Sequence, residues 1–261
     1  MLLRRITQHV KAQNWFAVGL DFLIVVVGVF IGIQVSNWNA AQQRSTTAEV
    51  FEARLIGDIR NEIGVIGNRI EIYTAIINIA DRLSIEIDGP KEALGPEFLR
   101  DAHFATSLWR FRRTQDTYDE LLTSGDLGLI ADTKVRSELS RYYRDLDAVV
   151  GIWDKQSKYA NFVRMYMPAG IQQKIRENCQ EYREGEFEKV HYAIKRDCQL
   201  SISERELQKA VDALLDPNAT GEQSFSVILN ELIGATNFKI TQLKRKRNSA
   251  HDLLTLMEGG H

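Results

Sequence analysis

The two cysteines are the residues whose chemistry depends most directly on their surroundings. Cys179 and Cys198 stand 19 positions apart in the sequence. In an oxidising compartment a pair at this spacing is expected to form one disulfide that closes a helix–loop–helix excursion. Such a loop contributes about 3 kcal/mol in the chain-entropy account. In a cytoplasmic protein the same residues would remain reduced thiols, so the interpretation depends on the compartment.

Acidic residues and one histidine fill the segment between the cysteines. A metal site could be drawn from Glu188 and His191. The chain has no H-E-x-x-H motif and no paired C-x-x-C motif, so we interpret this segment as a solvated acidic face. It also has no G-x-S-x-G, no Walker loop and no G-x-G-x-x-G. We therefore predict no catalytic residue, no metal site and no cofactor, and a protein that is not an enzyme.

Basic residues cluster at two places. Arg110, Arg112 and Arg113 could bind an anion or a lipid headgroup, and Lys244–Arg247 forms a second basic run. We interpret both as ordinary solvated or salt-bridged faces, and His103 as a surface or packing histidine. The net charge of −2 gives no basic domain, so no nucleic-acid partner is predicted.

An apolar stretch near the N-terminus is long enough to cross a bilayer. Residues 15–35 contain Asp21 and Gln34 as their only strongly polar members, and a spanning helix needs about 20 mostly apolar residues. Trp15 and Trp38 stand where indole rings favour the headgroup layer. A cleavable signal peptide is the alternative. No clean small-x-small cleavage site follows the stretch, so we predict an uncleaved signal anchor over 15–38.

The basic residues on either side of this segment indicate its direction. Arg4, Arg5 and Lys11 precede it, whereas Arg44 and Arg54 follow it. An excess of Lys and Arg marks the cytoplasmic flank. We expect residues 1–14 in the cytoplasm of a bacterium and residues 39–261, as a helical domain, in the periplasm beyond the inner membrane.

Small residues repeat along one face of the predicted anchor. Gly28, Gly32 and Ser36 follow one another at intervals of four, and Asp21 lies seven residues before Gly28, on about the same face. A G-x-x-x-G pair allows two helix backbones to approach closely in lipid. Asp21 is either hydrated near the boundary or turned toward a partner helix. The partner would be a second copy of the chain or another inner-membrane protein.

Heptad spacing dominates the rest of the chain. An average interval of 3.5 residues, typical of a coiled-coil or bundle seam, connects Ile56, Ile59, Ile63, Ile66, Ile70, Tyr73, Ile77 and Ala80. Further helices are predicted from Pro96, from Asp132–Thr133 to Pro168 with an interruption at Gln156, over 203–216, and after Thr220–Gln223. Capping boxes are expected at Thr117–Glu120 and Thr220–Gln223. Ser124–Gly128 is expected to be a turn, with use as a binding surface left open.

The predicted fold class is therefore all-α, with an N-terminal transmembrane helix that leads into an up-and-down helical bundle. No β-strand is predicted.

Two blocks of sequence carry a family resemblance. Gly28–Asn39 (GVFIGIQVSNWN) and Thr117–Tyr143 resemble an uncharacterised, mainly proteobacterial family of single-pass membrane proteins. The resemblance implies a membrane-anchored helical protein and names no catalytic residue.

These observations favour a non-enzymatic protein of the inner membrane that acts in assembly or protein–protein interaction. The alternative is a periplasmic ligand-sensing bundle that signals through a separate membrane partner.

Overall fold

The computed structural model describes residues 15–107, 115–153, 157–179, 181–184, 191–194, 198–216, 218 and 224–259. The chain divides into two compact units, Met1–Ala53 and Arg54–His261. Helix α2 (Trp15–Ile87) supplies the described part of the first unit and continues into the second. The fold class predicted from the sequence is confirmed: a long apolar N-terminal helix leads into a helical bundle.

In the first unit, the apolar side chains of α2 are exposed. Phe22 is 71% exposed, Ile24 59% and Phe30 61%. Among the described helices α2 alone combines the length and the apolar composition that a membrane crossing requires.

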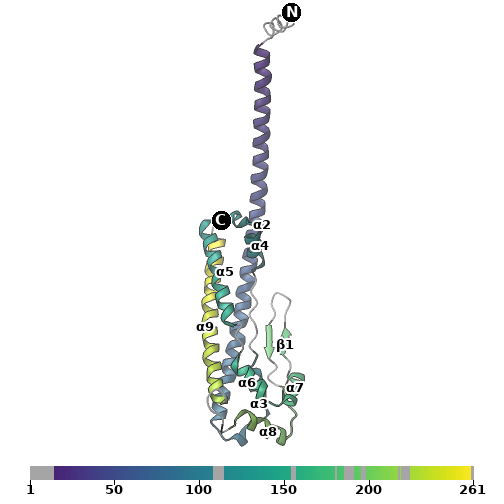
Figure 1. The fold of residues 1–261 in the computed structure, drawn as a ribbon, viewed down its shortest axis with the longest axis vertical. Coiled ribbons are helices and arrows are strands. Elements are labelled where there is room, and N and C mark those ends of the chain that lie inside the picture. Colours follow the sequence, from purple (N-terminus) through teal and green to yellow (C-terminus); the bar gives the residue numbers. More distant parts are fainter. Residues whose placement is uncertain are drawn as a thin grey trace, which may run out of the picture. The chain divides into compact units, whose positions relative to one another are not determined.

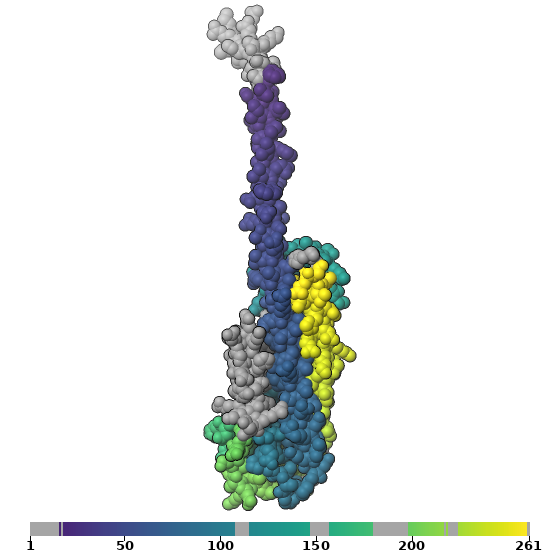
Figure 2. Space-filling view, turned by 180° about the vertical axis from the view of Figure 1, so that it is seen from behind, coloured from purple at the N-terminus to yellow at the C-terminus, as the bar shows by residue number. Residues whose placement is uncertain are grey.

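The second unit is built around three long helical segments, which are α2 from residue 54 onward, α5 (Thr133–Trp153) and α9 (Phe225–Glu258). Figure 1 shows α9 beside α5 and beside this part of α2. Figure 2, from behind, again shows α2 and α9 side by side. An ion pair of 2.5 Å between Arg60 of α2 and Glu258 of α9 connects these two helices.

Shorter helices and turns complete the second unit. They are η1 (Lys91–Ala93), α3 (Pro96–Phe104), α4 (Asp116–Ser124), η2 (Asp126–Leu129), α6 (Lys158–Tyr166), α7 (Ala169–Asn178) and α8 (Glu204–Leu214). Asp101 of α3 is buried and accepts hydrogen bonds from Arg82 of α2 and from Arg100. The rings of Phe98, Tyr159 and Phe162 each lie 5.8–6.1 Å from Phe225, and they fill the core where α3 and α6 meet α9.

Buried positions follow an alternation of four and three on both long helices. On α2 the buried positions of this seam are Leu55, Ile59, Glu62, Ile66, Ile70, Tyr73, Ile76, Ala80 and Leu83, and Ile72 and Ile79 are buried beside them. On α9 they are Phe225, Leu229, Leu232, Thr236, Ile240, Leu243, Lys246, Ala250, Leu253 and Met257, and Ile228 is buried beside them. The predicted heptad spacing of buried positions is thus confirmed. On α2, however, Ile56, Ile63 and Ile77 of the predicted stripe are only half-buried, because the seam is shifted by one position there.

Several predicted helix boundaries are confirmed. Pro96 occupies the first turn of α3. The Asp132 carboxylate caps α5 by accepting hydrogen bonds from the backbone N–H groups of Lys134 and Val135. α5 ends at Trp153 and α6 begins at Lys158, on either side of the predicted interruption. Gln156 itself lies outside the described residues.

The capping box predicted at Thr117–Glu120 is wrong. Helix α4 begins one residue earlier, at Asp116, and Thr117 is buried within its first turn. The capping pattern at Thr220–Gln223 lies outside the described residues. A capping box does occur at α8, where the Ser203 hydroxyl accepts from the Glu206 N–H and the Glu206 carboxylate accepts from the Ser203 N–H.

In the segment between the cysteines, the described residues form two short strands and not the predicted helix–loop–helix. Strands β1 (Glu181–Glu184) and β2 (His191–Ile194) pair antiparallel, with Glu181 opposite Ile194 and Glu184 opposite His191. The prediction that the chain has no strand is therefore wrong. Four residues are too few for an alternating pattern to show, and a ladder depends on a partner strand that local sequence does not reveal. A disulfide joins Cys179 and Cys198, which flank the two strands.

Candidate functional site: a buried polar cluster beside a cleft

A carboxylic acid lies in the core of the second unit. Glu62 of α2 occupies a seam position between Ile59 and Ile66 and is 1% exposed. Neither of its carboxyl oxygens has a hydrogen-bond partner among the described residues. Burial of a charged carboxylate without such partners is costly, so the environment favours the neutral acid.

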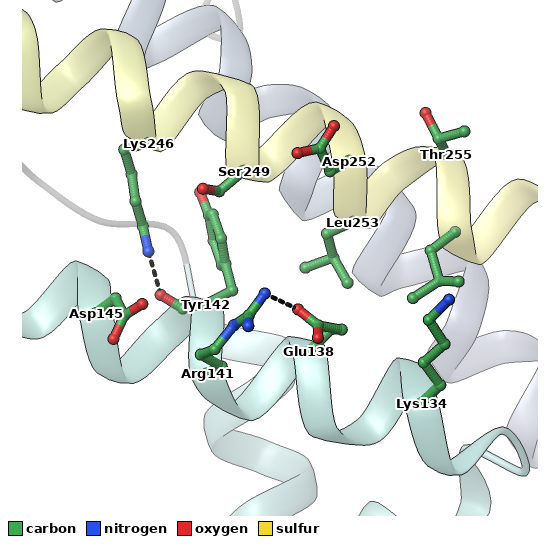
Figure 3. A pocket seen from close by; sticks show the side chains of 11 residues that line it. Lys134, Glu138, Arg141, Tyr142, Asp145, Lys246, Ser249, Asp252, Leu253 and Thr255 are labelled. Carbon is green, nitrogen blue, oxygen red and sulfur yellow. Dashed lines mark hydrogen bonds and ion pairs between the residues drawn. The ribbon is translucent and has the colours of Figure 1, made fainter.

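Two residues from the neighbouring long helices enclose Glu62. Tyr142 of α5 and Lys246 of α9 are both buried. The Lys246 ammonium donates a hydrogen bond to the backbone carbonyl of Tyr142 and lies 4.0 Å from the centre of the Tyr142 ring. Figure 3 shows the Lys246 side chain reaching from α9 to α5. We call Glu62, Tyr142 and Lys246 the core triad.

The surroundings of Glu62 act on its pKa in opposite directions. Burial is the largest effect and raises the pKa from 4.5 to about 7, with a smaller contribution in the same direction from Asp58. The Tyr142 hydroxyl and the Lys246 ammonium favour the ionised form and offset part of this rise. The Tyr142 hydroxyl acts on the carboxylate at close range, but the two groups do not meet hydrogen-bond geometry.

The pKa of Lys246 is shifted in the opposite direction. Burial lowers its pKa from 10.5 to about 8, and Arg141 contributes in the same direction. Asp145 and Glu62 raise it and so limit the decrease. Burial thus moves the two pKa values toward each other, so the pH range over which Glu62 and Lys246 are both charged is much narrower than for an exposed pair.

A stack of tyrosines extends the polar cluster toward α4. The ring centres of Tyr118 and Tyr143 are 4.5 Å apart and nearly parallel, and Tyr142 meets Tyr143 edge-on at 5.2 Å. Burial raises the pKa of both Tyr142 and Tyr143, and Glu62 adds to each increase. The phenols thus remain neutral hydrogen-bonding groups beside the carboxyl.

An open cleft of about 360 Å³ lies between α5 and α9, and Tyr142 and Lys246 of the core triad are among its lining residues. Figure 3 shows charged side chains of both signs along it, including an ion pair between Arg141 and Glu138. The lining residues are Lys134, Glu138, Arg141, Tyr142, Asp145, Lys246, Ser249, Asp252, Leu253, Thr255 and Leu256. The buried Glu62 acid therefore lies close to a polar cleft whose lining carries charges of both signs.

The residues predicted to pack the anchor lie together on α2. Asp21, Gly28, Gly32 and Ser36 are all exposed. A Cβ added at Gly28 or at Gly32 would meet no described atom within 4 Å. This face is therefore available to a partner helix.

One of the basic runs does not form the predicted surface patch. In the run Lys244–Arg247, Lys246 is buried in the core, and only the residues around it reach the surface. The error arises because composition alone does not say which residue of a basic run falls on the heptad seam. Arg110, Arg112 and Arg113 lie outside the described residues, as do the side chains of Glu188 and His191.

His103 is a packing histidine, in agreement with its interpretation from the sequence. Burial lowers its pKa to about 4, and Arg176 and Arg164 contribute in the same direction. Its ring lies 6.5 Å from that of Phe104. The Ser124–Gly128 segment is only in part the predicted turn: Ser124 ends α4, Gly125 at a φ of 77° is its C-cap, and Asp126 begins the 3-10 helix η2.

The sequence analysis missed Glu62 and Lys246 as members of one cluster, although a signal existed. Starting from Leu55 and Ile59, the alternation of four and three leads to position 62, and on α9 it leads from Leu243 to position 246. A charged residue at such a position is an exception to the apolar seam and marks a buried polar site. The isoleucine spacing leads instead from Ile59 to Ile63.

The chain matches no protein-family model, no curated protein and no solved structure. The resemblance to a proteobacterial family therefore stays a prediction.

Proposed function

We propose that this chain is a single-pass, non-enzymatic protein of a bacterial inner membrane whose helical bundle acts in assembly or protein–protein interaction. The observation that carries the proposal is the exposed apolar surface of α2. The proposal includes membership of the proteobacterial single-pass family that Gly28–Asn39 and Thr117–Tyr143 resemble.

The exposed apolar side chains of α2 support a lipid environment. Residues 18–35 present mostly large apolar groups over a length that matches the hydrocarbon core of a bilayer. In water such a surface would be unfavourable, whereas lipid stabilises it. A helix also satisfies its own backbone hydrogen bonds, as a spanning segment must.

The small-residue face supports association through this helix. Gly28 and Gly32 lack side chains, so a second helix backbone can approach closely and gain van der Waals contact in lipid. The partner is a second copy of this chain or another membrane protein. Asp21 on the same face would be directed toward that partner or toward the interface.

Two features support a cytoplasmic N-terminus and a periplasmic bundle. Arg4, Arg5 and Lys11 precede the apolar segment, in line with the rule that Lys and Arg mark the cytoplasmic flank. The disulfide between Cys179 and Cys198 suits an oxidising compartment.

Association is tested with the double variant Gly28→Leu/Gly32→Leu in the full chain. The control is Val26→Leu/Phe30→Leu, which alters side chains on the opposite face of the same helix. The measurement is the mass of the detergent-solubilised protein and the set of proteins that co-purify with it. We expect the glycine variant, and not the control, to lose its oligomer or its partner. Identical masses and partners for both variants and the wild type would reject association through this face.

Orientation is tested with the native cysteines in intact cells. A membrane-impermeant maleimide is applied with and without prior reduction, and adducts are mapped on Cys179 and Cys198. We expect labelling only after reduction. Labelling that requires lysis, in protein that labels fully once denatured, would place the bundle in the cytoplasm.

A further inference from the structure

The core triad brings together the Glu62 carboxyl, the Tyr142 hydroxyl and the Lys246 ammonium. In this structure not all three form hydrogen bonds at the same time. The Lys246 ammonium is engaged by the Tyr142 carbonyl and by the face of the Tyr142 ring. The Tyr142 hydroxyl and both Glu62 carboxyl oxygens have no hydrogen-bond partner among the residues that the structure describes. A neutral Glu62 is compatible with this arrangement, whereas a charged Glu62 is not, because a buried carboxylate needs donors.

We propose that the Glu62 carboxyl is a proton-binding site, and that its charge determines how α2 packs against α5 and α9. With the proton bound, the carboxyl is neutral and Lys246 stays with the Tyr142 carbonyl. With the proton released, the carboxylate attracts the Tyr142 hydroxyl and the Lys246 ammonium. Lys246 can then approach Glu62 only by giving up its hydrogen bond to α5. The two charge states thus favour two packings of the same three helices.

Charged and titratable groups on every helix around Glu62 fit this behaviour. Asp58, one turn earlier on α2, opposes ionisation of Glu62, while Tyr142 of α5 and Lys246 of α9 favour it. The resulting pKa is about 7. The charge of Glu62 also raises the pKa of Tyr143 of α5, as do Asp58 of α2 and Asp119 and Tyr118 of α4 to smaller extents. Around Lys246, Asp145 and Arg141 act in opposite directions.

The tyrosine stack provides a local reporter of this change. Tyr142 belongs to the core triad and its ring contacts that of Tyr143, which in turn stacks on Tyr118. Movement of Tyr142 toward Glu62 would alter the fixed geometry of these rings. Near-ultraviolet circular dichroism in the tyrosine region detects such a change without any label.

The test uses the full chain in detergent or in lipid nanodiscs, titrated from about pH 5 to about pH 9. With a pKa near 7, the ionised fraction of Glu62 rises from about 10% at pH 6 to about 90% at pH 8. We expect the tyrosine signal to follow this curve. We also expect the infrared band of a protonated carboxyl to disappear over the same range. A wild-type protein that shows neither transition overturns the proposal.

The decisive variant is Glu62→Gln, which resembles the protonated acid in shape and cannot ionise. The matched control is Glu71→Gln, which removes an exposed carboxylate from the same helix. We expect the carboxyl band, and the part of the tyrosine signal that follows it, to vanish in Glu62→Gln and to remain in Glu71→Gln. A tyrosine change caused by Lys246, whose pKa is about 8, occurs without that band. Transitions that persist unchanged in Glu62→Gln belong to another group, such as a histidine, and overturn the proposal.

A second variant retains the carboxyl and keeps the test decisive if Glu62→Gln does not fold. Lys246→Met removes the ammonium that favours the ionised form of Glu62. The midpoint of the transition is expected to move to higher pH by about one unit, because loss of a nearby opposite charge favours the neutral acid. A midpoint that does not move would show that Lys246 and the titrating group are not coupled.

Discussion

At the scale of single residues, the Glu62 carboxyl is buried at a large desolvation cost, and its place on the helix keeps it from reaching solvent. The heptad seam of α2 directs its side chain inward, and the flanking Ile59 and Ile66 are fully buried. The carboxyl therefore responds through its pKa, which rises from 4.5 to about 7. Lys246 responds in the opposite direction for the same reason, because burial penalises either charge.

These pKa changes predict an unusual dependence of stability on pH. The folded chain holds the Glu62 proton up to about pH 7, whereas the unfolded chain releases it near pH 4.5. The stabilising contribution of Glu62 is complete below about pH 4.5 and is lost as the pH rises through about 7. The lowered pKa of Lys246 makes stability rise again between about pH 8 and 10.5. These two groups together predict a minimum in the free energy of unfolding between about pH 7 and 8.

The first prediction follows for Glu62→Gln. In the wild type, the contribution of Glu62 to the free energy of unfolding is expected to be about 2 kcal/mol lower at about pH 7.5 than at about pH 5.5. In Glu62→Gln this difference disappears, while Glu71→Gln retains it. Denaturant unfolding of the bundle at the two pH values, followed by far-ultraviolet circular dichroism, measures it. A pH difference that is as large in Glu62→Gln as in the wild type would contradict the assignment.

At the scale of the elements, helices could be predicted from sequence and the short strands could not. The helices of the bundle repeat their pattern over several turns, so α5, α8 and α9 are recognisable from local spacing alone. The strand pair β1–β2 has four residues in each strand and depends on pairing between segments. Which of two adjacent positions is buried, as for Glu62 and Ile63, follows from the alternation that starts at Leu55, but the isoleucine spacing of α2 favours the wrong one of the two.

The second prediction concerns the disulfide that flanks the two strands. Cys179 is the C-cap of α7. Both it and Cys198 are buried, and the bond between them closes a loop with a sequence separation of 19. Reduction is expected to lower the free energy of unfolding by about 3 kcal/mol, mainly through the greater freedom of the unfolded chain. Denaturant unfolding with and without a reducing agent measures the change.

The double variant Cys179→Ser/Cys198→Ser provides the control for this prediction. Its stability should be insensitive to the reducing agent and close to that of the reduced wild type. If reduction leaves the wild type unchanged, the disulfide contributes nothing to the bundle.

At the scale of the whole molecule, the core belongs to the second unit alone. The most N-terminal of the buried core residues in the described part of the chain is Leu55, just after the boundary between Ala53 and Arg54. The apolar side chains of residues 18–35 are exposed and contribute nothing to that core. The two units therefore have separate sources of stability. The first depends on its surroundings, and the second depends on its own packing.

The third prediction is that the second unit folds without the apolar segment. A chain that begins at Arg44 retains Thr46 and Glu49, which have the spacing of a capping box and can start the shortened α2. We expect this chain to be soluble without detergent, helical, and within about 1 kcal/mol of the full chain in the free energy of unfolding, since it loses no buried side chain. Denaturant unfolding of both chains in the same detergent, with the disulfide intact, makes the comparison direct. A truncated chain that aggregates or unfolds without cooperativity would show that the first 43 residues stabilise the bundle, and the division of stability between the two units would then be wrong.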